Sequence, residues 1–175
     1  HNPPHDNGYK AYFSDGGQLV PPNDTGVIEE VEAITLSELK DYLKIDLSKV
    51  QTLGKDIDDD YVHAVVDTVI DPEAFKDADL KVVFTPIHGT GAISTLPAME
   101  QLGLEPILVE EQMVQDPEFP TVKSPNPENA EALEMAIQLS LKEGADILIG
   151  KDPDCDRMRV AFKNPDGGMT LITGN

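Results

Sequence analysis

Residues 128–157 read ENAEALEMAIQLSLKEGADILIGKDPDCDR and carry the pattern that decides the fold. Apolar residues at helical spacing predict a helix over residues 128–142, and Gly144 is a typical helix stop. The short apolar run DILIG, residues 146–150, predicts a buried strand, and an acidic loop follows it directly. A helix that leads into a buried strand indicates a βαβ unit and therefore a parallel sheet.

The same alternation extends in both directions along the chain. Further strands are predicted at residues 80–85, 106–109, 158–162 and 169–173, the last two flanking the hairpin turn NPDGG. Further helices are predicted at residues 36–43, 61–70 and 91–102, with Pro97 in the first turn of the last one or at a kink. The sequence therefore predicts an α/β protein, a three-layer α/β/α arrangement with a mostly parallel (mixed) sheet.

The first 24 residues differ from the rest. Residues 9–13 and 19–20 predict a hairpin around Asp15-Gly16-Gly17, but an isolated hairpin is only marginally stable in water. We expect residues 1–24 to belong to a neighbouring domain and residues 25–175 to form the α/β domain. A helix is predicted just after Pro21-Pro22, with one apolar face formed by Val27, Ile28, Val31 and Ile34.

The composition excludes several classes of function. In 175 residues, 13 basic and 33 acidic side chains give a formal net charge of -20. Such a charge repels nucleic acid and anionic lipid, so we expect neither as a partner. No apolar run approaches the length of a membrane span. Cys155 is the only cysteine, which excludes an internal disulfide and leads us to expect a cytoplasmic location.

The acidic loop after the strand at 146–150 is the clearest candidate site. Asp152, Asp154 and Asp156 alternate in a loop that proline stiffens, and Arg157 follows them. Three carboxylates can converge on one hard cation, and Mg²⁺ suits so few ligands. A calcium loop of the EF-hand type does not fit, because Arg157 stands where glycine is needed. The alternative is a solvated acidic turn with no bound ion.

Two other features leave alternatives open. The loop His88-Gly89-Thr90-Gly91 follows a strand and precedes a helix, so it could bind an anion, or it could be a tight turn with His88 bonded to backbone. Carboxylates around Cys155 are expected to raise the pKa of its thiol, which argues against a nucleophilic role. His1, His5 and Lys10 share a polar loop that indicates little by itself.

Taken together, these segments resemble the α-D-phosphohexomutase family of phosphoglucomutases and phosphomannomutases. HNPPHDNGYK at residues 1–10 resembles the active-site loop of the family, and DPDCDR at residues 152–157 resembles its magnesium loop. TPIHGTG, FPTVKSPNPE and the closing ITGN also resemble family segments in the same order. FPTVKSPNPE resembles the branch that contains bacterial phosphoglucomutases, phosphomannomutases and phosphopentomutase-like enzymes.

The resemblance implies a four-domain enzyme, of which this chain matches the end of domain I and domain II. Such an enzyme moves a phosphoryl group between the 1 and 6 positions of a hexose phosphate through a phosphoserine and a hexose bisphosphate. The resemblance assigns Asp152, Asp154 and Asp156 to Mg²⁺, Arg157 to phosphate, and His1 and Lys10 to catalysis. The serine would stand just before His1, so we expect the chain without domains I, III and IV to be inactive.

Two other functions remain open on the sequence alone. One is a different Mg²⁺-dependent phosphotransferase, such as a phosphatase with Asp152 as its nucleophile. That class places its carboxylates after the first strand of the domain, whereas these follow a late strand. The other is a sugar-phosphate-binding or regulatory module without catalysis. The preferred sugar and the oligomeric state are not indicated.

Overall fold

The computed structural model of the protein describes residue 5, residues 8–75 and residues 78–173. The chain divides into two compact units. One runs from Gly54 to the end of the described chain, and the other covers the described residues up to Leu53. The sequence analysis draws its domain boundary after residue 24 instead, and that boundary for the whole protein stays a prediction. No helix in the described ranges is long and apolar enough to cross a membrane.

The larger unit is built on a five-stranded sheet in the order β2-β1-β3-β4-β5. Strands β1, β2 and β3 run parallel to one another, whereas β4 and β5 are antiparallel to their neighbours. Their bounds are Val82–Thr85 for β1, Ile107–Leu108 for β2, Ile147–Lys151 for β3, Met158–Lys163 for β4 and Met169–Leu171 for β5. All five predicted strands of this unit are therefore confirmed, including the final hairpin.

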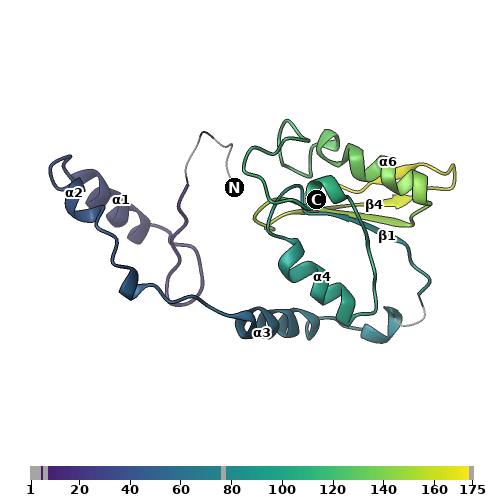
Figure 1. Ribbon diagram of the computed structural model, residues 1–175, viewed down its shortest axis with the longest axis horizontal. Coiled ribbons are helices and arrows are strands. Elements are labelled where there is room, and N and C mark those ends of the chain that lie inside the picture. Colours follow the sequence, from purple (N-terminus) through teal and green to yellow (C-terminus); the bar gives the residue numbers. More distant parts are fainter. Residues whose placement is uncertain (1–4, 6–7, 76–77, 174–175) are drawn as a thin grey trace. The chain divides into compact units, whose positions relative to one another are not determined.

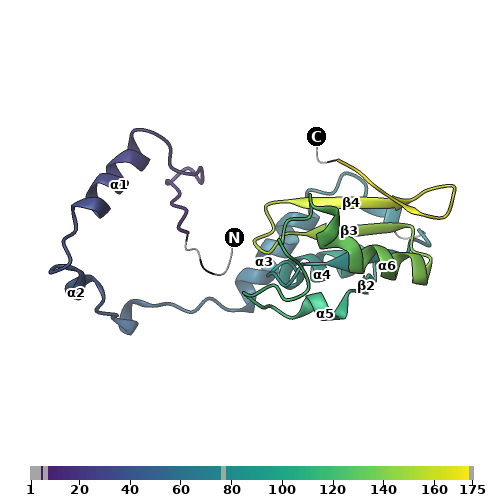
Figure 2. The same ribbon diagram turned by 90° about the horizontal axis from the view of Figure 1, so that it is seen from above.

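Helices cover both faces of this sheet, which confirms the three-layer α/β/α prediction. Figure 1 shows α6 on one face and α4 on the other, and Figure 2 shows α6 in front of β3 and β4. The helices of this unit are α3 (Lys55–Val66), η2 (Pro72–Phe75), α4 (Ala92–Gln101), α5 (Glu110–Met113), η3 (Ala130–Leu133) and α6 (Glu134–Glu143). Helix α3 packs against α4.

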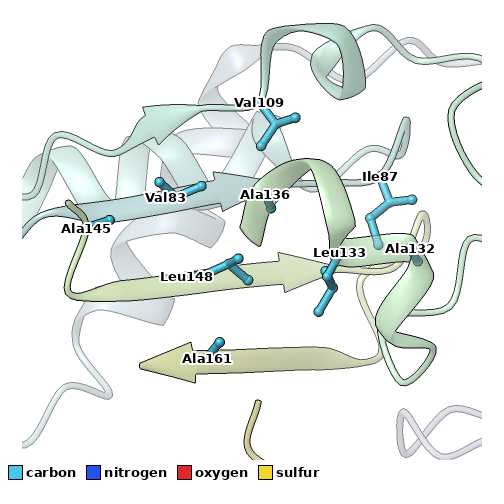
Figure 3. Close-up of a cluster of buried hydrophobic side chains, with 9 residues drawn as sticks. All are labelled: Val83, Ile87, Val109, Ala132, Leu133, Ala136, Ala145, Leu148 and Ala161. Carbon is cyan, nitrogen blue, oxygen red and sulfur yellow. The ribbon is translucent and has the colours of Figure 1, made fainter. Parts of the chain in front are cut away.

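The pleat of the strands sends alternate side chains into two separate cores. Val83 and Leu148 point to the α6 face, while Val82 and Phe84 point to the α4 face, where Met99 joins them. Figure 3 shows the α6-side cluster, which consists of Val83, Ile87, Val109, Ala132, Leu133, Ala136, Ala145, Leu148 and Ala161. Gly150 lets η3 approach β3 closely, since a Cβ atom there would collide with the Leu133 side chain.

Four helices differ in detail from the prediction, among them the helix predicted at 128–142, which begins at Ala130 and is divided into η3 and α6. Helix α3 begins at Lys55, six residues before the predicted start at 61, so the acidic run lies inside its first turns, where carboxylates favourably oppose the helix dipole. Pro97 lies within α4 rather than in its first turn, which removes one backbone hydrogen bond of that helix. The helix predicted at 36–43 is reduced to α2 (Leu39–Tyr42). The predicted stop at Gly144 is confirmed, with a φ of 67° in the left-handed region.

The smaller unit contains the predicted hairpin and helix. The hairpin has one bridge, between Tyr12 and Gln18. Helix α1 (Asn23–Ala33) is followed by α2 and η1 (Leu47–Lys49), and none of the three has a buried residue. The predicted apolar face of α1 exists, but Val27, Ile28 and Val31 are exposed on it. This unit therefore buries little apolar surface of its own.

Candidate metal centre

Two loops of the larger unit meet at the carboxyl ends of β1 and β3. The strands are paired in register, with Thr85 opposite Gly150, so both end at the same edge of the sheet. The first loop, residues 86–91, leads from β1 into α4. The second, residues 152–157, joins β3 to β4 and is called the acidic loop below. Ligands of open α/β sheets bind at this edge.

The acidic loop is held closed around Asp152, whose side chain is fully buried. One of its carboxylate oxygens accepts a hydrogen bond from the Arg157 backbone amide at 3.0 Å, and the other accepts one from Arg157 Nε at 2.8 Å. The Asp152 carbonyl accepts from the Cys155 amide at 3.1 Å. Cys155 has a φ of 65°, which turns the chain sharply enough to bring both ends of the loop together.

Asp152, Asp154 and Asp156 each place a carboxylate oxygen within 4.8 Å of the other two. Three oxygen donors at this spacing fit Mg²⁺, which takes a few carboxylates and fills its other positions with water or phosphate oxygens. Asp154 and Asp156 are exposed, so one side of the cluster faces solvent. The donor set, its spacing and its open side therefore suit the cation that the sequence predicts.

Burial shapes the ionisation of two groups in this loop. It raises the pKa of the Asp152 carboxyl above its usual range, and the neighbouring Asp156 adds to the rise, while hydrogen bonds from Arg157 oppose it. Burial also raises the pKa of the Cys155 thiol, and Asp152 and Asp154 contribute less. The predicted direction for Cys155 is confirmed, although its main cause is burial and not the carboxylates.

Arg157 lies against carboxylates in this structure. Its Nε atom lies 2.8 Å from Asp152 and 3.4 Å from Asp156. The Arg157 side chain as a whole is 40% exposed. The role of Arg157 in phosphate binding stays a prediction.

The loop of residues 86–91 is docked on the acidic loop by backbone contacts. Thr90 donates to the Pro153 carbonyl from its amide at 2.9 Å and from its hydroxyl at 3.0 Å. Gly89 lies so close to Pro153 that a Cβ atom there would stand 2.5 Å from the same carbonyl oxygen. A Cβ at Gly91 would stand 2.7 Å from Cys155 Sγ. The two glycines are therefore needed for close approach between the loops.

His88 is buried in this loop and hydrogen-bonded through both ring nitrogens. Nδ1 lies 2.8 Å from the Val114 carbonyl, and Nε2 lies 2.8 Å from the Thr121 hydroxyl. These contacts confirm the interpretation of His88 as a residue bonded to backbone within a tight turn. Gln112 and Thr121 could not be predicted from the sequence, because no spacing pattern connects them with this histidine.

The two predicted catalytic residues lie outside this unit or outside the described residues. His1 is among the residues that the structure does not describe. Lys10 is exposed in the smaller unit, where it lines a groove of about 490 Å³ beside Tyr9, Gln18 and α1. Their placement beside a reacting group stays a prediction.

A family model described as phosphoglucomutase/phosphomannomutase, alpha/beta/alpha domain II, matches residues 59–168 of this chain. These residues contain four of the five strands, β1 to β4, and the acidic loop. A solved phosphoglucomutase/phosphomannomutase family protein from Burkholderia thailandensis has a similar fold over 66% of this chain and 23% of its own, with a TM-score of 0.54 and 23% identity.

Relatives extend the likeness over the whole chain. A probable phosphomannomutase from Haemophilus influenzae is 33% identical over 179 residues, and a phosphoglucomutase from Staphylococcus aureus strain USA300 is 34% identical over 183 residues. Each alignment covers 100% of this chain but only 36% and 32% of the respective relative, so the chain spans about a third of their length. The sequence match and the shared fold show that this chain belongs to the phosphoglucomutase/phosphomannomutase family.

Proposed function

We propose that this chain serves in a Mg²⁺-dependent phosphohexomutase, which moves a phosphoryl group between the 1 and 6 positions of a hexose phosphate through a phosphoserine and a hexose bisphosphate. The observation that carries the proposal is the cluster of Asp152, Asp154 and Asp156 at the carboxyl edge of the sheet, in a chain of this family. The domains that would complete such an enzyme are its remaining partners, and we place it in the cytoplasm.

The acidic loop is built to hold a cation in one place. Asp152 is fixed by two hydrogen bonds from Arg157, so its carboxylate does not have to be ordered when the ion binds. Asp154 and Asp156 would supply the other two oxygens from the solvent side. When bound, Mg²⁺ would stabilise the negative charge that develops on the oxygens of a transferring phosphoryl group.

Arg157, Lys10 and His1 have complementary proposed roles. Arg157 would contact a phosphate oxygen with its guanidinium, since this planar group can bond a carboxylate and a phosphate at once. Lys10 would stabilise negative charge beside the phosphorylated serine, and His1 would transfer a proton there. These two roles rest on the motif at residues 1–10 alone.

The geometry of Asp152 argues against the phosphatase alternative. A carboxylate nucleophile needs an accessible oxygen, but the Asp152 side chain has no exposed surface and both of its oxygens accept hydrogen bonds from Arg157. A covalent aspartyl phosphate at this position would have to break these bonds. A cation needs only the second lone pair of one of these oxygens, so it would leave both bonds from Arg157 in place, and we therefore assign Asp152 to cation binding.

The experiment is a calorimetric Mg²⁺ titration of the wild-type chain, Asp154→Asn and Asp60→Asn at fixed ionic strength. Asp60 is an exposed acid on α3 and a better control than Asp59, which pairs with Lys55. We expect one Mg²⁺ to bind the wild type, Asp154→Asn to lose about tenfold or more in affinity, and Asp60→Asn to be unchanged. If all three chains bound Mg²⁺ with the same affinity, the acidic loop would be a solvated turn and not a cation site. In the full-length protein, Asp154→Asn should also slow interconversion of hexose phosphates.

A further inference from the structure

A chain of hydrogen bonds links β1 to the segment of residues 109–122, which contains α5. The Ile87 amide donates to Thr85 Oγ1 at 3.0 Å, and the Thr85 hydroxyl donates to Gln112 Oε1 at 2.6 Å. Gln112 Nε2 then donates to Thr121 Oγ1 at 3.0 Å, and Thr121 contacts His88 Nε2 at 2.8 Å. Thr85 and Gln112 have no exposed surface, so these bonds form in a low-dielectric interior.

The two ends of this chain fix the direction of every bond in it. The Val114 carbonyl can only accept, so His88 Nδ1 must carry the proton that it donates there. At the other end, the Ile87 amide can only donate, so Thr85 Oγ1 accepts and its own proton goes to Gln112. Thr121 accepts from Gln112 and its hydroxyl proton is left for His88 Nε2. Each group is then satisfied with a neutral imidazole in the Nδ1–H tautomer.

The opposite direction leaves groups unsatisfied. If His88 Nε2 donated to Thr121, both ring nitrogens would carry protons and a charge would stand in a site that is only 4% exposed. Thr121 Oγ1 would then accept from both His88 Nε2 and Gln112 Nε2, and its own hydroxyl proton would lose the acceptor that His88 offers in the forward direction. In the described part of the chain, no buried side-chain nitrogen or oxygen lacks a partner. The forward direction alone also gives the hydroxyl protons of Thr85 and Thr121 an acceptor each.

The bonds hold a backbone conformation that is costly without them. Ile87 and His88 have φ angles of 45° and 62°, a region that side chains, and β-branched ones above all, rarely adopt. Ile87 is anchored in the α6-side cluster (Figure 3). The His88 amide donates to the Gln112 carbonyl at 2.8 Å, and the His88 carbonyl accepts from the Asp116 amide at 3.2 Å. Gly89 and Thr90, which dock on Pro153, follow directly.

From this geometry we infer that His88 is a positioning residue for the acidic loop. In its Nδ1–H tautomer it completes the chain of bonds through Thr121, Gln112 and Thr85. This chain fixes residues 86–91 in the conformation from which Thr90 bonds Pro153, next to Asp152. The inference rests on the proposed function, since it is the cation site that requires a fixed acidic loop.

The tautomer is tested first, by ¹⁵N NMR of the histidine rings in the wild-type chain at neutral pH. His88→Gln identifies the His88 signals among those of the four histidines by their disappearance. We expect a neutral ring with its proton on Nδ1 and a hydrogen-bonded lone pair on Nε2. A proton on Nε2, in the neutral or the charged ring, would overturn the assignment. This measurement needs no metal and no activity.

The positioning effect is tested with Thr121→Val, which keeps the shape of the side chain but removes the hydroxyl, and with Thr121→Ser, which restores it. We expect the Thr90 amide to exchange about tenfold faster in Thr121→Val than in the wild type, and within about twofold of the wild type in Thr121→Ser. Mg²⁺ affinity should fall about three- to tenfold in Thr121→Val alone. Met99→Ala is the control, because it weakens the core on the opposite face of the sheet without touching these bonds.

The outcomes separate the two proposals. Equal Thr90 exchange in Thr121→Val and Met99→Ala at matched loss of thermal stability would overturn the positioning role. Absence of Mg²⁺ binding in the wild type would instead contradict the proposed function, while the Thr90 exchange and the His88 tautomer would still decide the role of His88. Should Thr121→Val fail to fold, the tautomer measurement and Thr121→Ser keep the inference testable.

Discussion

The Pro153 carbonyl accepts two hydrogen bonds from Thr90, one from the backbone amide at 2.9 Å and one from the side-chain hydroxyl at 3.0 Å. Thr90 and Pro153 are separated by 63 positions in the sequence, and they belong to the loops that leave β1 and β3. The contact lies between Asp152 and Asp154, two of the three candidate cation ligands. The shape of the acidic loop therefore depends on a second loop that offers no ligand of its own.

Thr90→Val and Thr90→Ser test this contact directly. Valine removes the hydroxyl bond but leaves the amide bond, so we expect about 1 kcal/mol lower stability to unfolding and about threefold weaker Mg²⁺ binding. Serine keeps the hydroxyl and should behave like the wild type. Urea unfolding and calorimetric titration of both chains give the two quantities. Equal Mg²⁺ affinity of Thr90→Val and Thr90→Ser would show that the hydroxyl does not support the acidic loop.

Gly89→Ala should disturb the same interface more strongly. The added Cβ would stand 2.5 Å from the Pro153 carbonyl oxygen, and backbone cannot give way as a flexible side chain can. We expect a loss of about 1–3 kcal/mol in the free energy of unfolding, together with weaker Mg²⁺ binding.

Gly26→Ala is the matched control for this substitution. Gly26 lies inside α1 and a Cβ there meets nothing within 4 Å, so alanine should leave Mg²⁺ binding unchanged and favour the helix slightly. Thermal unfolding and Mg²⁺ titration of the two variants make the comparison. A Gly89→Ala chain as stable as the wild type would mean that the two loops do not approach each other so closely.

Asp152 should make the stability of the metal-free chain depend on pH. Burial raises the pKa of this carboxyl in the folded chain above its ordinary value of 3.8, so folding favours the protonated form. The protonated Asp152 carboxyl stabilises the fold in full below pH 3.8, and this stabilisation is lost as the pH rises through the higher pKa of the carboxyl in the folded chain. Asp152→Asn should remove this loss, while Asp60→Asn should retain it.

The same ionisation should oppose cation binding in acid. Mg²⁺ requires the Asp152 carboxylate, so protons compete with it, and its affinity should begin to fall at a pH above the ordinary range of an aspartate. Thermal unfolding in the presence of a chelator and Mg²⁺ titration, both across a pH series, measure the two effects. A pH profile of Asp152→Asn that matches the wild type would contradict the raised pKa.

Much of the larger unit could be predicted from the sequence, because local patterns specify it. The strand at 146–150 and the helix before it show apolar periodicity, and the acidic loop is contiguous, so three candidate ligands are visible in six residues. The bonds of His88 could not be predicted in this way. They join residues 26 and 33 positions apart, and one threonine or glutamine resembles any other until the chain folds.

The division of the chain at Gly54 was also not visible in the sequence. Val27, Ile28 and Val31 have the spacing of a buried helical face, and the pattern alone does not reveal that this face is exposed. Periodicity predicts that a helix is amphipathic, but only tertiary contacts show whether a partner covers its apolar side. The helix itself is therefore confirmed, whereas the predicted domain boundary after residue 24 stays a prediction.

The two units should differ in local stability. Strand β1 lies between β2 and β3 and is fully buried, so its amides should exchange with solvent only when the whole larger unit unfolds. The hairpin at residues 9–20 has a single bridge, closed by bonds such as Leu19 N–H to the Ala11 carbonyl at 2.9 Å. Its large apolar residues Tyr9, Tyr12 and Phe13 are exposed, so little free energy opposes opening.

We therefore expect the amides of Phe13 and Leu19 to exchange orders of magnitude faster than those of Val83 and Phe84, measured by NMR or mass spectrometry on the intact chain. The hairpin of β4 and β5 is the matched control, because it has a similar Gly-containing turn but continues a sheet with a buried core. The Ala161 amide should accordingly be protected more strongly than Leu19. If Leu19 and Val83 were protected equally, the smaller unit would have a stability of its own that its exposed apolar residues do not explain, and the division of the chain at Gly54 would be wrong.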